Sequence, residues 1–324
     1  MSTTTPFSMF FLLLCMPSLA LLPHRTLAEP LRQRRAETRS WPWPRNVVPR
    51  SEPAAGYFAP ADGGGAMLTQ APNTGDPPLG EPLNVIIAGT SDPAVLVDQQ
   101  SDGGFRNFFL SVGFSAECLG QHEGAPQTAN LGDGNGYLNE TSELRWDYGD
   151  PTLGTCQETV HGGNHFRYWT QSGKSADSGA YFLATSYELP IAEDHNIIVN
   201  GYNLGRDWLI GNITGSPINT SALTNTSTFT GTTSYAGFIY SSSIAYVSGL
   251  LANSSSGVNH GGDVGINGQT AVDGLVAVVT ISIATKPANA TKSGAIRIVP
   301  TTTLPFVALI PTLLVGLLLG ALSL

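Results

Sequence analysis

Apolar segments near both ends of the chain leave only its middle as a candidate folded domain. Residues 7–22 form an apolar run broken by Pro17, and the small residue Ala28 follows at a suitable cleavage position. We therefore predict that residues 1–28 are a secretory signal peptide, with cleavage after Ala20 as the alternative. An N-terminal transmembrane helix needs roughly 20 unbroken apolar residues, and this run is shorter.

The second apolar segment, residues 304–324, has no charged residue after it. Residues 286–303 precede it as a spacer, with three consecutive small residues that begin at Ser293. Small residues, a spacer and an apolar tail form the signal for a glycosylphosphatidylinositol (GPI) anchor, and Ser293 is the predicted anchor site. A C-terminal transmembrane helix is the alternative. The tail contains Pro305 and Pro311, and an interior proline costs a helix about 3 kcal/mol.

Residues 29–80 separate the signal peptide from the predicted domain. They are rich in proline and glycine and show no sustained period of 2 or 3.6. This composition is typical of a disordered or extended pro-segment or linker. The dibasic pair Arg34 and Arg35 lies within it, and cleavage there would make Ala36 the first residue of the mature chain.

Cysteine usage agrees with export. Cys15 falls in the signal peptide, so Cys118 and Cys156 remain in the mature chain. Two cysteines in an oxidising compartment most simply form a disulfide, and the alternative is two free thiols. Closing a loop of this length stabilises a fold by roughly 3–4 kcal/mol in the chain-entropy model.

Six acceptor sequences for N-glycosylation indicate a eukaryotic secretory pathway. Their asparagines are Asn139, Asn212, Asn219, Asn225, Asn253 and Asn289. Three of them fall within residues 212–227, which are rich in serine and threonine. We interpret that stretch as an exposed, glycosylated surface loop.

The charge distribution argues against nucleic-acid binding. Residues 51–285 contain five basic and 22 acidic residues, a net charge of −17. Such an acidic body repels phosphate backbones.

Hydrophobic periodicity predicts a single compact α+β domain with a mixed, largely antiparallel sheet and a few helices, over residues 81–285. Residues 83–88 and 275–283 are expected to be strands, and residues 165–170 and 179–187 an antiparallel hairpin. A helix is expected over residues 201–210. Another is expected to start at Asp92, with Pro93 at its first position and with Phe105, Phe108, Phe109 and Val112 at helical spacing. The alternative is two pieces that are separated at Gly103 and Gly104.

Two of the five histidines and two of the four arginines of this body lie in three short segments, residues 165–169, 194–197 and 206–209. The candidate catalytic residues are His165 and His195, and the candidate ligand-binding residues are Arg167, Arg206, Asp194 and Asp207. If they converge, the two arginines would bind an anionic group while a histidine transfers a proton. The alternative is a structural brace in which Arg167 pairs with Asp194 or Asp207.

Metal and serine-hydrolase motifs are weak. His161 and His165 are four residues apart, but two intervening glycines oppose the helix that would bring them to one ion. Asp133 and Asn135 match the start of a calcium loop, whereas Leu138 and Leu144 occupy positions that need glycine and glutamate. The chain lacks a Gly-x-Ser-x-Gly motif. We predict no metal site and no cofactor.

Several of these segments resemble one known family. Residues 82–87, 165–169, 195–197 with 206–209, and 272–278 occur in the order seen in the LssY C-terminal-like domain. The chain also resembles secreted fungal proteins that carry this domain. The bacterial domain is often attached to membrane proteins with lipid-phosphatase-like segments, and its own activity is unassigned, so the resemblance implies a fold but no catalytic residue.

These features predict a secreted or cell-surface glycoprotein held at the membrane by its anchor or by a C-terminal helix, with a binding or structural role. Its expected ligand is a cell-wall component or an anionic small molecule. The alternative function is a hydrolase that acts on an anionic ester or sugar at the cluster of His165, Arg167, His195 and Arg206.

Overall fold

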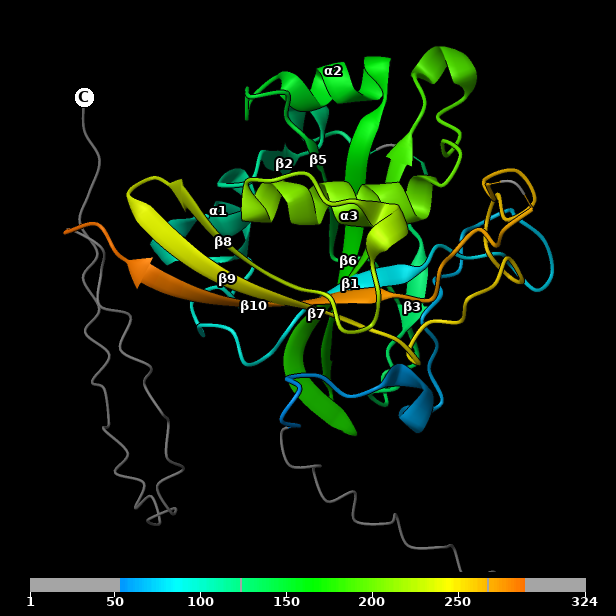
Figure 1. The fold of residues 1–324 in the computed structure, drawn as a ribbon, viewed down its shortest axis with the longest axis horizontal. Helices are drawn as coiled ribbons and strands as arrows, with labels where there is room; N and C mark the ends of the chain where they lie inside the picture. The colour runs from blue at the N-terminus through cyan, green and yellow to red at the C-terminus, as the bar shows by residue number, and fades with distance from the viewer. Residues whose placement is uncertain (1–52, 123, 267, 289–324) are drawn as a thin grey trace, which may run out of the picture. The chain divides into compact units, whose positions relative to one another are not determined.

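The computed structural model describes residues 53–122, 124–266 and 268–288 (Figure 1). The predicted signal peptide, the Arg34–Arg35 pair, Asn289, the anchor site Ser293 and the apolar tail lie outside these residues. Within the described part of the chain, none of the helices has the length and apolar character needed to cross a membrane.

The central element is an eight-stranded mixed sheet with the strand order β2-β5-β6-β7-β1-β10-β9-β8. Its strands are β1 (Leu83–Ile87), β2 (Phe114–Ala116), β5 (Ser142–Trp146), β6 (Gly163–Gly173), β7 (Ala176–Glu188), β8 (Thr228–Tyr235), β9 (Phe238–Val247) and β10 (Val276–Thr285). β1 pairs in parallel with β10, and the other neighbouring strands pair antiparallel. A separate two-stranded sheet joins β3 (Thr128–Asn130) to β4 (Tyr137–Asn139).

Three α-helices and five short 3-10 helices accompany the sheets in the described residues. They are α1 (Phe105–Leu110), α2 (Gly154–His161), α3 (Gly201–Thr214), η1 (Pro60–Gly63), η2 (Ser101–Gly103), η3 (Cys118–Gly120), η4 (Ile191–Glu193) and η5 (Thr220–Ala222). This arrangement confirms the predicted α+β class with a single compact domain and a largely antiparallel sheet.

The core has two parts, one on each face of the sheet. Val85 and Ile87 of β1 belong to a cluster with the buried faces of α1 and α3, whereas Leu83 and Ile86 belong to a cluster on the opposite face. Strict alternation would place Leu83 and Val85 on the same face. The pairing of β1 with β7 shifts register between these two residues, and a bulge of this kind moves the following side chains to the other face.

Helix α3 packs directly on the hairpin of β6 and β7, and Figure 1 shows it lying across them. Gly205 makes this close approach possible, because a Cβ atom there would lie 2.6 Å from a backbone atom of Ser186. Asn164 of β6 donates a hydrogen bond of 2.8 Å from its side-chain amide to the carbonyl of Gly205. The helix ends at Gly215, which has a positive φ of 73° and suits a helix C-terminus.

Most of the strand and helix predictions are confirmed, with two corrections. The side-chain carboxylate of Asp92 accepts a hydrogen bond from the backbone N–H of Ala94, but this turn does not continue as an α-helix. Helix α1 begins only at Phe105, after the two glycines. Asn212 lies in α3 rather than in an exposed loop, because the helix extends four residues beyond the predicted end. The other described glycosylation acceptors, Asn139, Asn219, Asn225 and Asn253, are exposed.

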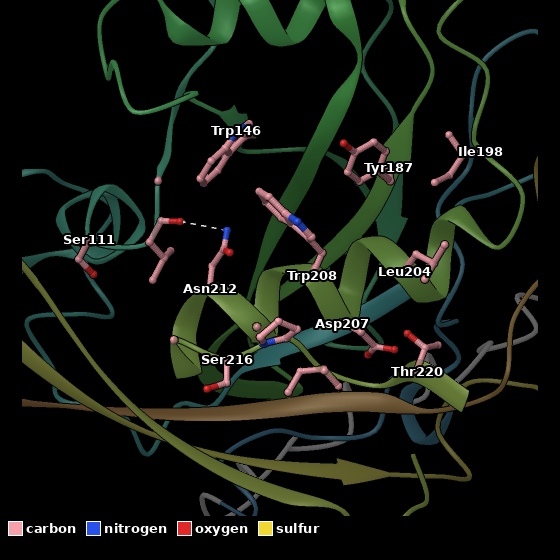
Figure 2. Close-up of a pocket in the computed structure, with 16 residues that line it drawn as sticks. Ser111, Trp146, Tyr187, Ile198, Leu204, Asp207, Trp208, Asn212, Ser216 and Thr220 are labelled. Atoms are coloured by element: carbon pink, nitrogen blue, oxygen red, sulfur yellow. Dashed lines mark hydrogen bonds between the residues drawn. The ribbon is translucent and has the colours of Figure 1, made fainter. Parts of the chain in front are cut away.

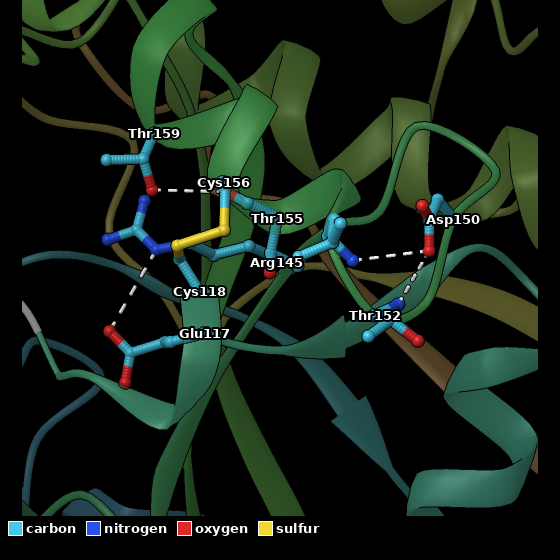
Figure 3. Close-up of a disulfide and its surroundings, with 9 residues drawn as sticks. Glu117, Cys118, Arg145, Asp150, Thr152, Thr155, Cys156 and Thr159 are labelled. Atoms are coloured by element: carbon cyan, nitrogen blue, oxygen red, sulfur yellow. Dashed lines mark hydrogen bonds and ion pairs between the residues drawn. A yellow bond between two sulfur atoms is a disulfide. The ribbon is translucent and has the colours of Figure 1, made fainter.

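The predicted disulfide between Cys118 and Cys156 is present. It links η3 to the first turn of α2 and closes a separation of 38 residues (Figure 3). The side chains of Glu117 and Arg145 approach each other beside it, at 4.0 Å. The disulfide therefore holds α2 and η3 together next to a cluster of charged side chains.

Candidate functional site

A cluster of buried charged side chains lies on one face of β5, β6 and β7. We call it the charge cluster and define it as Glu81, Glu140, Glu143, Arg145, Glu158, His165, Arg167 and Glu188, with His195 at its edge. Period-2 alternation produces this face, since Leu144 and Phe166 point to the opposite, apolar side. Sheet register then pairs Glu143 with Arg167 and Arg145 with His165.

The two guanidinium groups of the charge cluster form ion pairs with carboxylates. Arg167 lies 2.8 Å from Glu143, 3.5 Å from Glu140 and 3.7 Å from Glu81. Arg145 lies 2.6 Å from Glu143 and 2.9 Å from Glu158. These contacts replace the predicted pairing of Arg167 with Asp194 or Asp207, and they leave little positive charge to attract an anionic ligand.

His165 is fully buried at the centre of the charge cluster. Its Nε2 lies 3.3 Å from the hydroxyl of Ser186, 3.4 Å from Arg167 and 3.5 Å from Glu188. Burial lowers the pKa of the imidazole to about 4, against the opposing effect of Glu188 and Glu143. The ring is therefore neutral at pH 7.

Glu158 of α2 is also fully buried. Burial raises the pKa of its carboxyl group to about 7, although the neighbouring Arg145 acts in the opposite direction. One of its oxygens accepts a hydrogen bond of 2.9 Å from Arg145, and the other makes no hydrogen bond.

Arg206 and Asp207 form a separate ion-pair network. The predicted convergence of Arg206 with His165, Arg167 and His195 is therefore wrong. Arg206 donates hydrogen bonds of 2.7–2.9 Å to the carboxylates of Asp207 and Asp273. Tyr246 donates a further hydrogen bond of 2.8 Å to Asp207, and its ring lies 5.3 Å from the guanidinium carbon. Asp273 and Leu275 directly precede β10, so the hydrogen bonds of Arg206 attach α3 to the start of that strand.

The remaining predicted site residues are scattered. Asp194 is exposed and has a left-handed conformation with φ 61°. His195 follows it and lies 3.6 Å from Glu188, so it joins the charge cluster at its partly exposed edge. His161 ends α2 in an exposed position, whereas His165 is buried on β6. Asp133 accepts backbone hydrogen bonds from Asn135 and Gly173 and thus fixes a turn.

An aromatic pocket beside α3 was not predicted from the sequence (Figure 2). Its volume is about 660 Å³, and aromatic and aliphatic side chains make up much of its wall. Trp146 and Trp208 meet edge to face with their rings 4.6 Å apart, and Tyr187 lies 6.3 Å from Trp208. Leu204 is exposed at the rim. The helical spacing of Leu204, Trp208 and Asn212 was the available signal, but Trp146 and Tyr187 come from β5 and β7.

Asp207 and Asn212 are polar members of the pocket wall. The charge of Asp207 is offset by Arg206. Asn212 donates a long hydrogen bond of 3.4 Å from its side-chain amide to the carbonyl of Val112.

No protein-family model, curated protein or solved structure matches this chain. The resemblance to the LssY C-terminal-like domain therefore stays a prediction.

Proposed function

We propose that the chain is a secreted, GPI-anchored cell-surface glycoprotein whose domain binds a small, neutral and largely apolar ligand in the aromatic pocket. The predicted signal peptide, glycosylation acceptors and C-terminal signal support the location. The pocket carries the proposal of binding, because partly exposed tryptophan rings around a cavity of this size are typical of a small-molecule site.

The charge of the pocket wall favours a neutral ligand. Asp207 is the charged residue among those that line the pocket, and Arg206 and Tyr246 already bind its carboxylate. A cationic ligand would have to compete with a fully buried guanidinium group. An anionic ligand would meet no free positive charge in the described wall. Asn212, Ser216 and Thr220 remain to orient a hydroxyl or carbonyl group.

The alternative function, hydrolysis of an anionic ester or sugar at the charge cluster, is less well supported. It requires a guanidinium group that is free to bind the anion. Arg145, Arg167 and Arg206 are each surrounded by carboxylates. The aromatic pocket is therefore the better candidate for ligand binding.

The Leu204→Arg variant is expected to bind pocket ligands at least about tenfold more weakly, because a long charged side chain at the rim obstructs the pocket. A library of neutral hydroxylated and apolar small molecules would be screened by tryptophan fluorescence and calorimetry. The matched control is Val160→Arg, which introduces the same charge at an exposed apolar position on α2. Equal affinity in wild type and Leu204→Arg, or no ligand in the library, would contradict the proposal.

A glycan on Asn212 would stand at the same pocket wall. The screen therefore includes the Asn212→Gln variant, in which that glycan cannot form. Binding by Asn212→Gln alone would indicate that the glycan occupies the pocket in the wild type, and it would contradict the proposal for the glycosylated protein.

The proposed anchor has its own test. Treatment of intact expressing cells with a phospholipase specific for GPI anchors is expected to release the protein into the medium. Ser293 and its small neighbours would be replaced by bulky residues as the control, and that variant should not become anchored. Retention of the wild-type protein on the cells after treatment would favour a transmembrane tail.

A further inference from the structure

Three side chains of the charge cluster offer ligand atoms at spacings close to those of a metal site. Glu158 of α2, His165 of β6 and Glu188 of β7 each provide one such atom, and the three atoms lie within 4.8 Å of one another. Ligand atoms about 2.0–2.2 Å from one ion lie roughly 3–4 Å apart. A small rotation of the Glu158 and Glu188 carboxylates would bring ligand atoms that now lie up to 4.8 Å apart into this range.

The charge balance favours a cation at this position. Six carboxylates share two guanidinium groups, those of Arg145 and Arg167. They are Glu81, Glu117, Glu140, Glu143, Glu158 and Glu188. The elements packed around the site contribute these groups: β5, β6, β7, α2, the segment before β1, the segment after β4 and the residue before η3. Buried charge without compensation is unfavourable, and a divalent cation offsets two of the excess negative charges.

Unpartnered buried atoms at the site supply a second, independent observation. Glu158 and His165 are both fully buried, yet Oε1 of Glu158 and Nδ1 of His165 make no hydrogen bond. Arg145 binds only the other oxygen of Glu158, at 2.9 Å. Buried polar atoms normally have a partner, so an acceptor oxygen left over beside a buried imidazole indicates a ligand at this position.

We propose that Glu158, His165 and Glu188 bind one divalent first-row cation of the Mn²⁺ or Zn²⁺ class. One imidazole nitrogen with two carboxylate oxygens suits such ions, whereas Ca²⁺ prefers six to eight oxygen ligands. Arg145 acts as a positioning residue, since its hydrogen bond to Glu158 fixes the direction of the free oxygen. The partly exposed His195 next to Glu188 marks the side from which the ion enters.

The site joins α2 to β6 and β7 and is separate from the aromatic pocket. A cation that binds only the folded state stabilises it by mass action. At a free concentration of 100 times its dissociation constant, the ion is expected to raise the melting temperature by about 5–10 °C.

The test uses the whole secreted protein with its disulfide intact, treated with a chelator and dialysed. MnCl₂, ZnCl₂ and CaCl₂ would each be titrated by calorimetry, with the bound metal measured by elemental mass spectrometry and the melting temperature recorded. We expect one Mn²⁺ or Zn²⁺ per chain, a higher melting temperature, and a much weaker response to Ca²⁺. Less than 0.1 ion per chain for both Mn²⁺ and Zn²⁺ would overturn the proposal.

Variants locate the ion. Glu158→Gln and Glu188→Gln keep the side-chain shapes and are each expected to weaken binding at least about tenfold. Glu188 is partly exposed, so its variant serves if Glu158→Gln fails to fold. The matched control is His122→Asn, which alters a neighbouring group of possible ligands formed by Glu117, His122 and Glu143. Loss of binding in His122→Asn, with full binding in the two glutamine variants, would refute the site.

Discussion

The Arg206→Ala variant is expected to lose about 3–5 kcal/mol of the free energy of unfolding. The side chain of Arg206 has no exposed surface, and it donates hydrogen bonds to Asp207, Asp273 and the carbonyl of Leu275. Its removal leaves the carboxylate of Asp207 buried with Tyr246 as its remaining donor. The measurement is urea denaturation of the disulfide-intact protein, followed by circular dichroism and tryptophan fluorescence.

Arg106→Ala is the matched control for this prediction. Arg106 also binds a carboxylate at 2.7 Å, that of Asp98, but 35% of its side chain is exposed. Water screens and solvates such a pair, so the variant is expected to lose less than about 1 kcal/mol. Losses of similar size in the two variants would show that burial does not determine the contribution of Arg206.

Removal of the disulfide by the double substitution Cys118→Ala and Cys156→Ala is expected to cost about 4 kcal/mol. The two cysteines are 38 residues apart, and the bond restricts the unfolded chain by closing a loop of that length. Helix α2 has only eight residues, so it depends on its attachment to η3 and to the sheet. Denaturation of the double variant would be compared with that of the oxidised wild type.

Two further measurements support the disulfide experiment. Reduced wild-type protein is expected to unfold at the same urea concentration as the double variant, and non-reducing peptide mapping should recover Cys118 joined to Cys156. A double variant as stable as the oxidised wild type would mean that strain in the folded state cancels the effect of loop closure.

The local elements of the fold could be predicted because their signals lie within short segments. β1 is a run of buried apolar residues, and the β6–β7 hairpin follows from period-2 alternation around a short turn. The parallel pairing of Val85 with Ala277 could not be predicted in the same way. These residues are almost two hundred positions apart, and no local pattern specifies which distant strand pairs with a given edge.

The same distinction between local and long-range signals applies to the candidate sites. The sequence identified His165 and Arg167 as unusual, and it identified the cysteines that form the disulfide. The partners proposed for Arg167, Asp194 and Asp207, were wrong, because they were chosen from the charged residues of the neighbouring segments. Arg167 instead contacts Glu143 across the β5–β6 register, together with Glu81 from the segment before β1.

By itself, the sequence determined the strands β1, β6, β7 and β10, the helix α3, the disulfide and the acidic character of the domain, since each depends on composition or on the period of side chains along one segment. Only the tertiary structure decided that six carboxylates surround Arg145 and Arg167, that Arg206 binds Asp273, and that Trp146 meets Trp208 in a pocket. Sheet register and the packing of α3 bring these residues together, and both result from the burial of apolar side chains elsewhere in the molecule.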